Sequence, residues 1–478
     1  MVTTSSFSDD GSASSGTRRM FLGTLIATSI ASFIVQFNST LLNVALPSIS
    51  ADLDASISQL QWVVNAYTLG YLGLLLPMGA ACDRLGAKQV FLSGCFIFAA
   101  ASLACAFTNT PGELISARVL QGFGAAQLVP SAIGLVRRSC GDDQKQFALA
   151  IGIWTAAGGA GFATGPVLGG ALLADAGWHM LFAINVPLCL VALFVGARYL
   201  VSQSSAPEPI PADWLGQAVI VASLLSLTWG ITESRQMGIY HPHVAGALCL
   251  AALGAAALIR IEKSAQQPVL APALFRNVPF TATLAYGFLI NSSFAGVFFL
   301  LTLFLQSARG YSPWEAGLAF IPLTLTFVVS NTLGGRLVSK FGFRFPMAGG
   351  ALTAAAGYAL LFALGETESV LRMLFGFVLI PAGVGVATPA MTAAALACVE
   401  RAVSSTVSAV VAVVRQMAAL IGVAFAGLLV GSGSPASLSS GLDVAAILAI
   451  AMLVFAAAVA LLVKVGGGQD TPRSSHTK

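Results

Sequence analysis

The chain has 478 residues, of which 57% are apolar and 9% are charged, and its formal net charge is +4. A soluble domain carries about 25% charged residues, so this composition excludes a water-soluble protein and indicates a polytopic helical membrane protein. We see no basic patch typical of nucleic-acid binding, and the seven Cys show neither CxxC nor metal-binding spacing. We therefore expect no nucleic-acid partner, no disulfide, no metal site and no cofactor.

Between two polar ends, the apolar runs predict fourteen spans, each of about twenty residues or more. Residues 1–17 are rich in Ser and predict a disordered tail, and residues 464–478 predict a second tail. The first apolar run begins at Phe21 and is too long for the core of a signal peptide, so we interpret it as a retained first span. The predicted spans are 21–46, 60–80, 89–107, 113–136, 147–174, 178–200, 214–233, 244–261, 279–306, 314–338, 345–364, 370–398, 404–431 and 443–463.

The distribution of Lys and Arg predicts cytoplasmic termini. With the N-terminus placed inside, eighteen of the 23 basic residues fall in inner loops, tails or span ends, and three fall outside: Arg235, Arg309 and Arg372. This split follows the positive-inside rule and agrees with an even number of spans. The remaining two basic residues, Arg118 and Arg415, lie within spans.

An internal repeat and a linker predict the domain organisation. The polar, Pro-rich segment 201–213 separates six N-terminal spans from the rest. Four residues after span 2 recur 256 residues later: Gly79, Arg84, Gly86 and Lys88 correspond to Gly335, Lys340, Gly342 and Arg344. We therefore predict the following segments: a six-span half in 18–200, an inserted pair of spans in 214–261, a cytoplasmic loop in 262–278 and a second six-span half in 279–463.

Span 1 contains Asn38-Ser-Thr-Leu-Leu-Asn-Val-Ala-Leu-Pro47. This run resembles the motif Leu-Asp-x-Thr-x-x-Asn-x-Ala-Leu-Pro of the fourteen-span drug:proton antiporter branch of the major facilitator superfamily. Asn38 stands where that branch has Asp, and we place no acidic residue at mid-membrane. Either an acid at a span end, Glu113 first, replaces the missing proton carrier, or the coupling differs. We expect Asn38 in the substrate path; the alternative is a hydrogen bond to a neighbouring helix.

The turn after span 2 runs Gly79-Ala-Ala-Cys-Asp-Arg-Leu-Gly-Ala-Lys88. Its Gly86 suits a tight left-handed turn. The turn resembles the superfamily signature Gly-x-x-x-Asp-Arg-x-Gly-x-Lys/Arg, which implies a conformational latch formed by Asp83, Arg84, Gly86 and Lys88. The alternative is a simple topological anchor. Since the second copy has Ser339 in place of the acid, we expect any second latch to be weaker.

Span 4 contains a charge, Arg118, in Ala117-Arg-Val-Leu-Gln-Gly-Phe-Gly124. A charge within a span costs about 2.5–3.5 kcal/mol or more and normally faces a cavity or a partner. The stretch resembles the superfamily motif Arg-x-x-x-Gly-x-Gly, which implies a proton-coupling role for Arg118, shared with Glu113. We assign Gln121 to the substrate cavity. The alternative is an Arg that snorkels to the outer interface.

Span 5 contains Gly158-Gly-Ala-Gly-Phe-Ala-Thr-Gly-Pro-Val-Leu-Gly-Gly170. Gly161, Gly165 and Gly169 form one smooth stripe that allows close approach of another helix, and Pro166 permits a kink. The residues alone leave a static packing seam and a moving hinge equally open. The run resembles the superfamily's antiporter signature Gly-x-x-x-x-x-x-Gly-Pro-x-x-Gly-Gly, which implies an exporter with a hinge. The signature residues are Gly158, Gly165, Pro166, Gly169 and Gly170.

Three later features are weaker. Trp178 begins a stretch similar to a further signature of the branch, although a Trp at the interface is also an anchor. Tyr286, Asn291 and Phe294 fall at helical spacing in span 9 and line either a substrate cavity or a packing face. Arg415 is a second charge within a span, span 13, and we favour a structural role for it.

The resemblance covers residues 20–463 and implies an all-α major-facilitator bundle. It implies a secondary active exporter, not an enzyme, that exchanges protons for small amphipathic organic compounds such as drugs, antibiotics or natural products. We expect a monomer in the lipid bilayer of the bacterial inner membrane, with the substrate cavity between the halves. The alternatives are an uptake or metabolite carrier on the same fold and a membrane sensor that does not transport.

Overall fold

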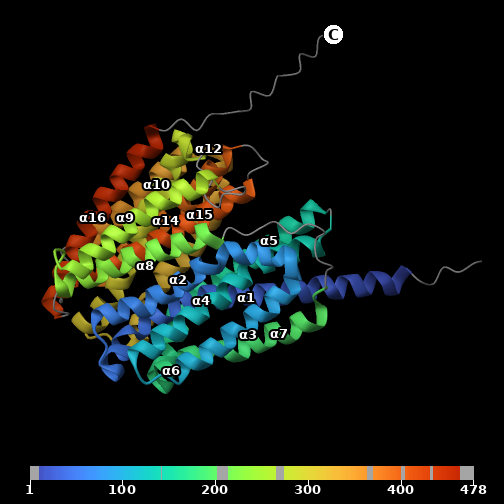
Figure 1. Cartoon of the computed structure of the whole chain (residues 1–478), viewed down its shortest axis with the longest axis horizontal. Coiled ribbons are helices and arrows are strands. Elements are labelled where there is room, and N and C mark those ends of the chain that lie inside the picture. Colours follow the sequence, from blue (N-terminus) through green and yellow to red (C-terminus); the bar gives the residue numbers. More distant parts are fainter. Residues whose placement is uncertain are drawn as a thin grey trace, which may run out of the picture.

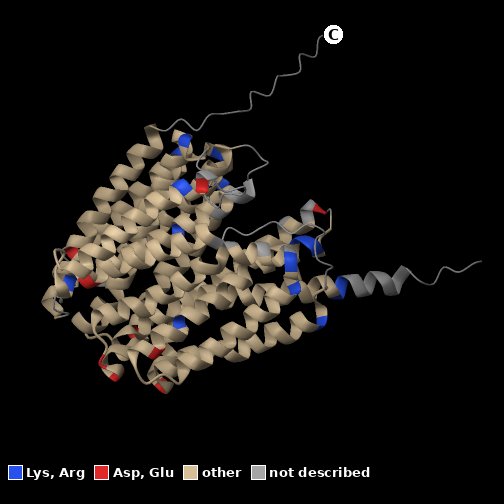
Figure 2. Ribbon diagram, in the orientation of Figure 1, with Lys and Arg blue, Asp and Glu red and all other residues tan. Residues whose placement is uncertain are grey.

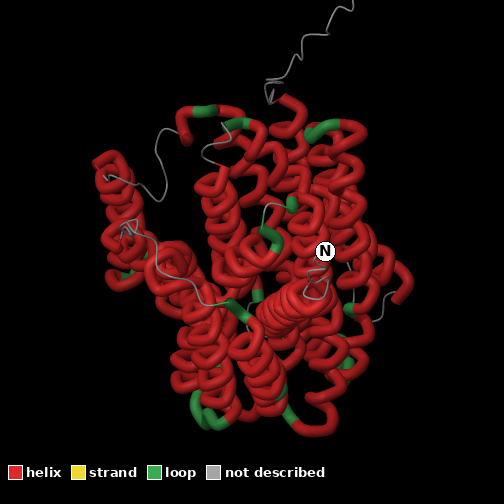
Figure 3. Tube along the Cα trace, turned by 90° about the vertical axis from the view of Figure 1, so that its right-hand side faces the viewer, coloured by secondary structure: helices red, strands yellow, loops and turns green. Residues whose placement is uncertain are grey.

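The computed structural model describes residues 10–141, 143–201, 214–264, 274–362, 370–399, 404–430 and 434–462. Throughout these residues the chain consists of helices joined by short loops (Figures 1 and 3). The predicted linker beyond residue 201, the C-terminal tail and residues 265–273 of the predicted loop lie outside the described part. Helix α1 begins at Asp10 and thus includes residues 10–17, which the sequence assigns to the N-terminal tail.

The first group of helices runs to Tyr199 and the inserted pair follows it. The first group is α1 (Asp10–Leu53), α2 (Ile57–Ala81), the short π-helix η1 (Cys82–Gly86), α3 (Ala87–Ala106), α4 (Pro111–Ser139), α5 (Gln144–Ala176), α6 (Trp178–Ala183) and α7 (Asn185–Tyr199). The inserted pair is α8 (Trp214–Met237) and α9 (Pro242–Ser264). The last group is η2 (Leu274–Arg276), α10 (Val278–Leu303), η3 (Phe304–Ala308), α11 (Pro313–Ala319), α12 (Ile321–Phe341), α13 (Arg344–Leu361), α14 (Val370–Ala397), α15 (Ser404–Leu429) and α16 (Pro435–Leu462).

Two predicted spans are each divided into two helices. Span 6 breaks at Ile184, between α6 and α7, and span 10 breaks at Phe320, between α11 and α12. In each case a Pro follows shortly after the break, Pro187 or Pro322. Because Pro has no N–H, it cannot bond the carbonyl four residues earlier, and the helix is interrupted there.

Twelve helices among the described residues are long and apolar enough to cross a membrane. The chain is therefore a multi-pass membrane protein, but this criterion does not confirm the fourteen predicted spans. The two predicted spans outside the twelve are occupied by α2, with 25 residues, and by α13, with 18. Large apolar side chains such as Phe96 and Phe194, 66% and 73% exposed, cover the outside of the bundle, as a lipid-facing surface requires.

The same set of helix pairings occurs twice. In the first group, α1 packs on α5 and α7, and α4 packs on α2 and α3. In the last group, α10 packs on α15 and α16, and α14 packs on α12 and α13. Gly86 and Gly342, which are 256 residues apart, both have positive φ, +89° and +71°. The ψ of Gly86 is 136°, so its backbone lies outside the left-handed helical region that the sequence predicts, although its φ still favours Gly.

The two groups form two bundles that meet along α2, α5, α11, α12 and α15 (Figure 1). Helix α5 packs on α11 and α12, and α2 packs on α15. The inserted helix α8 packs on both α2 and α15, so it lies over one seam between the bundles. Most Lys and Arg residues lie toward one end of the molecule, which is also the end where the two bundles diverge (Figures 1 and 2).

Candidate functional site

The best-defined polar site surrounds Arg118 on α4, whose side chain is only 2% exposed. Its Nε donates to the carbonyl of Val63 on α2 at 3.0 Å, and its Nη1 donates to Oε1 of Gln121. The Gln121 amide in turn donates to Ser102 on α3 at 2.7 Å. The guanidinium therefore ties three helices together, which excludes a side chain that snorkels into the interface.

Aromatic rings complete the surroundings of this charge. The Cζ atom of Arg118 lies 4.5 Å from the ring centroid of Tyr67 and 6.0 Å from that of Phe182. All these partners of the guanidinium in the described part of the chain are neutral: a carbonyl, an amide and two rings. Cation–π attraction and charged hydrogen bonds offset part of the cost of burying the charge, but no carboxylate neutralises it.

Asn38 on α1 belongs to the same buried region. Its side chain is 1% exposed, and its Oδ1 accepts a long hydrogen bond, 3.5 Å, from Asn185 on α7. The Tyr67 hydroxyl lies next to Asn38 and within electrostatic range of Arg118, so Tyr67 connects the two predicted residues. The Asn38 amide nitrogen and the Tyr67 hydroxyl lie near each other without a well-formed hydrogen bond, and the Asn185 amide oxygen has no hydrogen-bond partner among the described residues. Buried polar atoms without partners are costly, which is typical of a region that serves function rather than stability.

Glu113 lies apart from this region, at the exposed start of α4. Its Oε2 accepts from the backbone N–H of Asn109 at 2.9 Å, and its own N–H donates to the Thr110 hydroxyl at 3.3 Å. These contacts are those of a helix N-cap. The structure thus brings Arg118, Gln121 and Asn38 together and leaves Glu113 at the surface.

The structure describes the side chains of Arg84 and Lys88 in the predicted latch, but not that of Asp83. Lys88 on α3 donates to the carbonyls of Ala197 and Leu200 at 3.1 and 2.6 Å, which caps the C-terminal end of α7. Arg84 is exposed within η1. The side chain of Asp83 lies outside the described part, so its pairing stays a prediction.

The Gly stripe of α5 packs closely against α1, which confirms the predicted close approach of another helix. A Cβ atom on Gly158 would lie 2.7 Å from the Ser32 hydroxyl, and one on Gly169 would lie 3.0 Å from Leu41. At Gly161 and Gly165 a Cβ would collide with the Phe33 carbonyl and the Thr40 side chain. Thr40 also donates to the carbonyl of Phe162 at 3.1 Å. The hinge role of the stripe stays a prediction.

A second face of α5 contacts the other bundle. A Cβ on Gly170 would lie 2.5 Å from the Pro313 carbonyl on α11, and one on Gly317 would lie 2.5 Å from the Pro166 carbonyl. The signature residues therefore lie at two contacts at once: Gly158, Gly165 and Gly169 face α1, whereas Pro166 and Gly170 face α11. The contacts between α5 and α11 lie at the end of the molecule opposite most of the basic residues, since α5 ends and α11 begins there.

The predicted residues of span 9 lie on different faces of α10. Tyr286 is 1% exposed and its hydroxyl donates to the Met347 carbonyl at 2.6 Å, so it points into its own bundle. Asn291 donates to the Gly287 carbonyl of its own helix at 2.7 Å. Phe294 stacks on Phe327 of α12 with centroids 5.8 Å apart, and Phe327 packs on Phe162 of α5 at 5.0 Å. Of the three, only Phe294 belongs to an aromatic cluster shared by both bundles.

Arg415 on α15 lies across the seam from α2. It interacts electrostatically with Tyr71 of that helix. Nearby, the Gln61 amide of α2 donates to the carbonyls of Val423 and Ala424 on α15 at 2.8 and 2.9 Å. Gln61, Tyr67 and Ser102 were not among the site residues predicted from the sequence, although polar residues within predicted spans are a signal that could have identified them.

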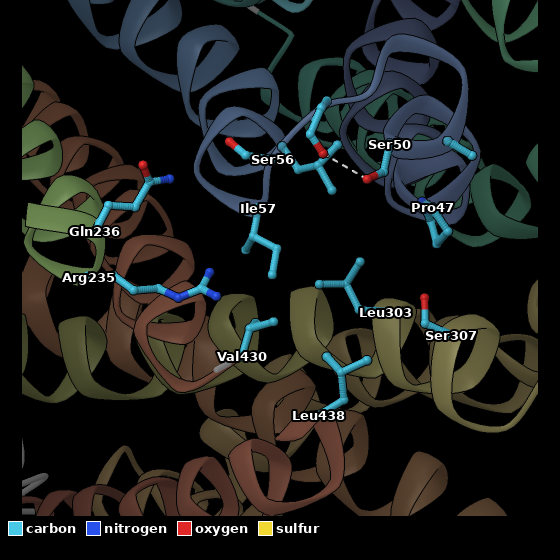
Figure 4. A pocket seen from close by; sticks show the side chains of 13 residues that line it. Pro47, Ser50, Ser56, Ile57, Arg235, Gln236, Leu303, Ser307, Val430 and Leu438 are labelled. Carbon is cyan, nitrogen blue, oxygen red and sulfur yellow. Dashed lines mark hydrogen bonds between the residues drawn. The ribbon is translucent and has the colours of Figure 1, made fainter. Parts of the chain in front are cut away.

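A cavity of about 610 Å³ lies where α1, α2, α8, α10, η3 and α16 meet, next to the residue that follows α15, Val430 (Figure 4). That volume is within the range of about 300–1,000 Å³ for pockets that hold small organic ligands. None of the predicted cavity residues lines it. Its walls include Pro47, Ile57, Leu303, Val430 and Arg235. From the sequence, Arg235 was predicted only to be one of the three outer basic residues.

The fold and these sites define a class: a membrane carrier of two related helical bundles, with a buried charge in the first and a close-packed seam between them. Residues 28–423 match the Major Facilitator Superfamily, and the chain belongs to this family.

Curated relatives of the chain are resistance and efflux proteins. It is 33% identical to the methylenomycin A resistance protein of Streptomyces coelicolor, over 83% of this chain and 82% of that one. It is 30% identical to the multidrug resistance protein Stp of Mycobacterium tuberculosis, over 89% of this chain and 79% of that one. It is 34% identical to the tetracenomycin C resistance and export protein of Streptomyces glaucescens, where the match covers 72% of this chain and 63% of that longer protein.

Solved structures with the same fold are more distant in sequence. The nucleoside transporter NupG aligns over 92% of this chain and 99% of its own, with a TM-score of 0.69 and 12% identity. A bacterial homologue of the lysosomal transporter Spinster, solved in an inward-facing and unoccupied conformation, aligns over 93% and 96%, with a TM-score of 0.64 and 19% identity. At these identities the likeness supports the fold alone.

Proposed function

We propose that this chain exports small amphipathic organic compounds, of the drug, antibiotic or natural-product type, in exchange for protons. The α5 seam carries the proposal: the signature residues that resemble those of antiporters contact α1 in the first bundle and α11 in the other, so this helix lies where the two bundles meet and must move against each other. The relatives with resistance and export in their names support the same direction of transport.

The proposal includes a topology. Helices α2 and α13 supply the two spans beyond the twelve that meet the length and composition criterion, giving fourteen spans in two six-span halves with α8 and α9 inserted. Both termini lie in the cytoplasm of a bacterial cell and the protein spans its inner membrane as a monomer. The asymmetry of Lys and Arg supports this orientation.

In this orientation the close contacts of Gly170 with Pro313 and of Gly317 with Pro166 lie on the outer side. They support a conformation closed to the outside, from which the halves rock apart around the seam. The latch residues, with Lys88 on the α7 carbonyls, lie on the cytoplasmic side and close it in the other state.

For coupling, we propose that the charge of Arg118, which only neutral groups surround, responds to a proton or a substrate that enters the region. We place Asn38, Gln121 and Phe294 in the substrate path. Tyr286 and Asn291 also stay candidates for the path, although their contacts within their own bundle also suit a packing role. Glu113 stays the candidate proton carrier, and its exposed position would have it exchange protons with the outer solution.

Reconstitution into proteoliposomes tests direction and coupling together. With an imposed pH gradient, we expect counter-directed movement of a labelled amphipathic compound that an uncoupler abolishes. Accumulation of the compound in the direction of proton flow would favour the uptake carrier. Binding without movement in either direction would favour the membrane sensor.

A further inference from the structure

The 610 Å³ cavity is lined by all three parts of the chain, near the end of α1 and the start of α2, which is the end of the molecule opposite most of the Lys and Arg residues. Pro47 and Ile57 come from the first bundle, Leu303 and Val430 from the last, and Arg235 from the inserted helix α8. In Figure 4 the guanidinium of Arg235 extends from α8 toward the space between Ile57, Val430 and Leu303. An inserted helix thus contributes a charged group to a cavity between the halves.

The chemistry of the lining is asymmetric. Arg235 is the only charged residue among those that line the cavity, and no carboxylate lines it. No hydrogen bond or ion pair joins Arg235 to another residue in the described part of the chain, so its donors are available. The nearby acid on the same helix, Glu233, instead accepts a hydrogen bond from Ser58 of α2 at 2.6 Å. The remaining wall combines apolar side chains such as Ile57, Leu303 and Val430 with neutral polar ones: Ser50, Ser56, Gln236 and Ser307.

We propose that this cavity is an outer subsite for amphipathic organic anions, in which Arg235 binds the carboxylate and the apolar wall binds the carbon skeleton. A planar guanidinium suits bidentate carboxylate recognition, and an apolar surround strengthens the attraction. The inference rests on the proposed export function and narrows it: acidic amphipathic compounds pass through this subsite before release. Because both halves form the walls, rocking of the halves changes the shape of the subsite and releases its occupant.

An anionic lipid headgroup offers the same charge as an exported acid. We commit to the exported compound because the walls come from three parts of the chain and Figure 4 shows the guanidinium turned toward the interior of the cavity rather than along α8. The experiment below separates the two sources by the lipid that surrounds the protein.

The test measures binding to the full chain in nanodiscs made only of phosphatidylcholine, by fluorescence titration. The probes are dansylglycine, an aromatic compound with one carboxylate, and its neutral amide. We expect the Arg235→Gln variant to bind the acid about tenfold more weakly, the effect of losing a charged hydrogen bond, and the amide with unchanged affinity. Arg235→Lys should retain much of the affinity for the acid. Arg372→Gln removes another outer Arg that does not line the cavity, and should change neither affinity.

A second variant tests the location. Ala51 lines the cavity, and Ala51→Trp should weaken binding of both probes because the indole fills the space. Unchanged acid binding in Arg235→Gln, or unchanged binding of both probes in Ala51→Trp, would overturn the proposal. In nanodiscs in which phosphatidylglycerol replaces part of the phosphatidylcholine, loss of the bound acid would also overturn the proposal, because it would show that the site binds a lipid headgroup. If the Arg235 and Ala51 effects appear but proteoliposomes export nothing, the subsite stands and the export function fails.

Discussion

At the scale of single residues, Arg118 is a permanent charge held by neutral groups. A buried ion pair can be cancelled by protonating its acid, whereas the guanidinium of Arg118 contacts a carbonyl, an amide and two aromatic rings, none of which is an acid that protonation could neutralise. Any positive charge or proton that enters the region is therefore repelled by Arg118, and any negative charge is attracted. This makes the residue suitable for coupling, because its field acts on whatever occupies the space near Asn38.

We predict that Arg118→Ala retains membrane insertion and loses export by about tenfold or more, since it removes charged hydrogen bonds to Val63 and Gln121. Arg118→Lys should recover only part of the activity because an ammonium lacks the planar set of donors that joins two helices. The measurement is efflux of a neutral amphipathic substrate, normalised to protein in the membrane. Normal efflux of Arg118→Ala at normal abundance would rule out the coupling role.

Asn38 permits a second test at the same scale. An Asp at this position would add a negative charge beside Asn185 and near Tyr67, whose ring lies against Arg118. The local field would then change from positive to near neutral, so we predict that Asn38→Asp exports a monovalent cationic dye severalfold faster than wild type.

Asn38→Ser supplies the control, because it changes the size and hydrogen bonding of the side chain without adding charge. This variant should export the cationic dye no faster than wild type. Neutral substrates should be exported equally by the wild type and by Asn38→Asp. Equal export of the dye by these two proteins would show that Asn38 only bonds a neighbouring helix.

At the scale of elements, α5 is the helix whose packing the sequence predicts best. The period of the Gly residues gives the stripe, and the stripe requires a neighbour at backbone distance. What the period cannot give is the identity of that neighbour. The structure places α1 on one face of α5 and α11 on another, and the second contact depends on the small residue Gly317, which lies far away in sequence.

We predict that Gly165→Leu inserts normally and loses export, because its side chain would collide with Thr40 and force the two helices apart. Overpacking of this kind costs about 1–3 kcal/mol, which is enough to favour one conformation without unfolding the bundle. Gly152→Leu on the same helix is the matched control, since a Cβ there meets nothing within 4 Å. The prediction is wrong if both variants export at the wild-type rate.

Helix breaks show what apolar length does not predict. Spans 6 and 10 are each long and apolar enough to cross a membrane as one segment, as the sequence predicts, but the break in the helix before Pro187 and Pro322 was not predicted. Glu113 shows a related limit: it is close to Arg118 in sequence, but its position in the capping turn directs its carboxylate to Asn109 rather than to the buried charge. Asn38 and Arg118 could be placed in one region because both lie in the same half of the predicted membrane depth.

At the scale of the whole molecule, one short path joins the buried charge to the contact between the bundles. Arg118 holds the Val63 carbonyl of α2. Two residues earlier on that helix, Gln61 donates to two carbonyls of α15 in the other bundle. Pairings within a bundle follow from the repeat, whereas this cross-bundle contact depends on one side chain and could not be predicted from period or composition.

We predict that Gln61→Met opens the seam between α2 and α15 more often. Met has nearly the volume of Gln and no donor, so the variant loses both bonds without leaving a hole. Two hydrogen bonds contribute about 1–3 kcal/mol in total, which corresponds to an increase of about tenfold in the open population. The measurement is the rate at which a membrane-impermeant thiol reagent, added from outside, labels a Cys introduced in place of Val423, in a chain whose native Cys are replaced by Ser.

The matched control is Gln217→Met, because Gln217 of α8 donates to the Leu72 carbonyl of α2 at 2.7 Å and does not join the two bundles. It loses one bond of the same kind, so its labelling rate should equal that of the parent chain. If Gln61→Met labels no faster than Gln217→Met, the α2–α15 bonds do not limit opening of this seam. The closed conformation then depends on the other contacts between the bundles, such as the α5–α11 contact, where Gly170 meets Pro313, and the hydrogen bond from Gln306 of η3 to the Val44 carbonyl of α1.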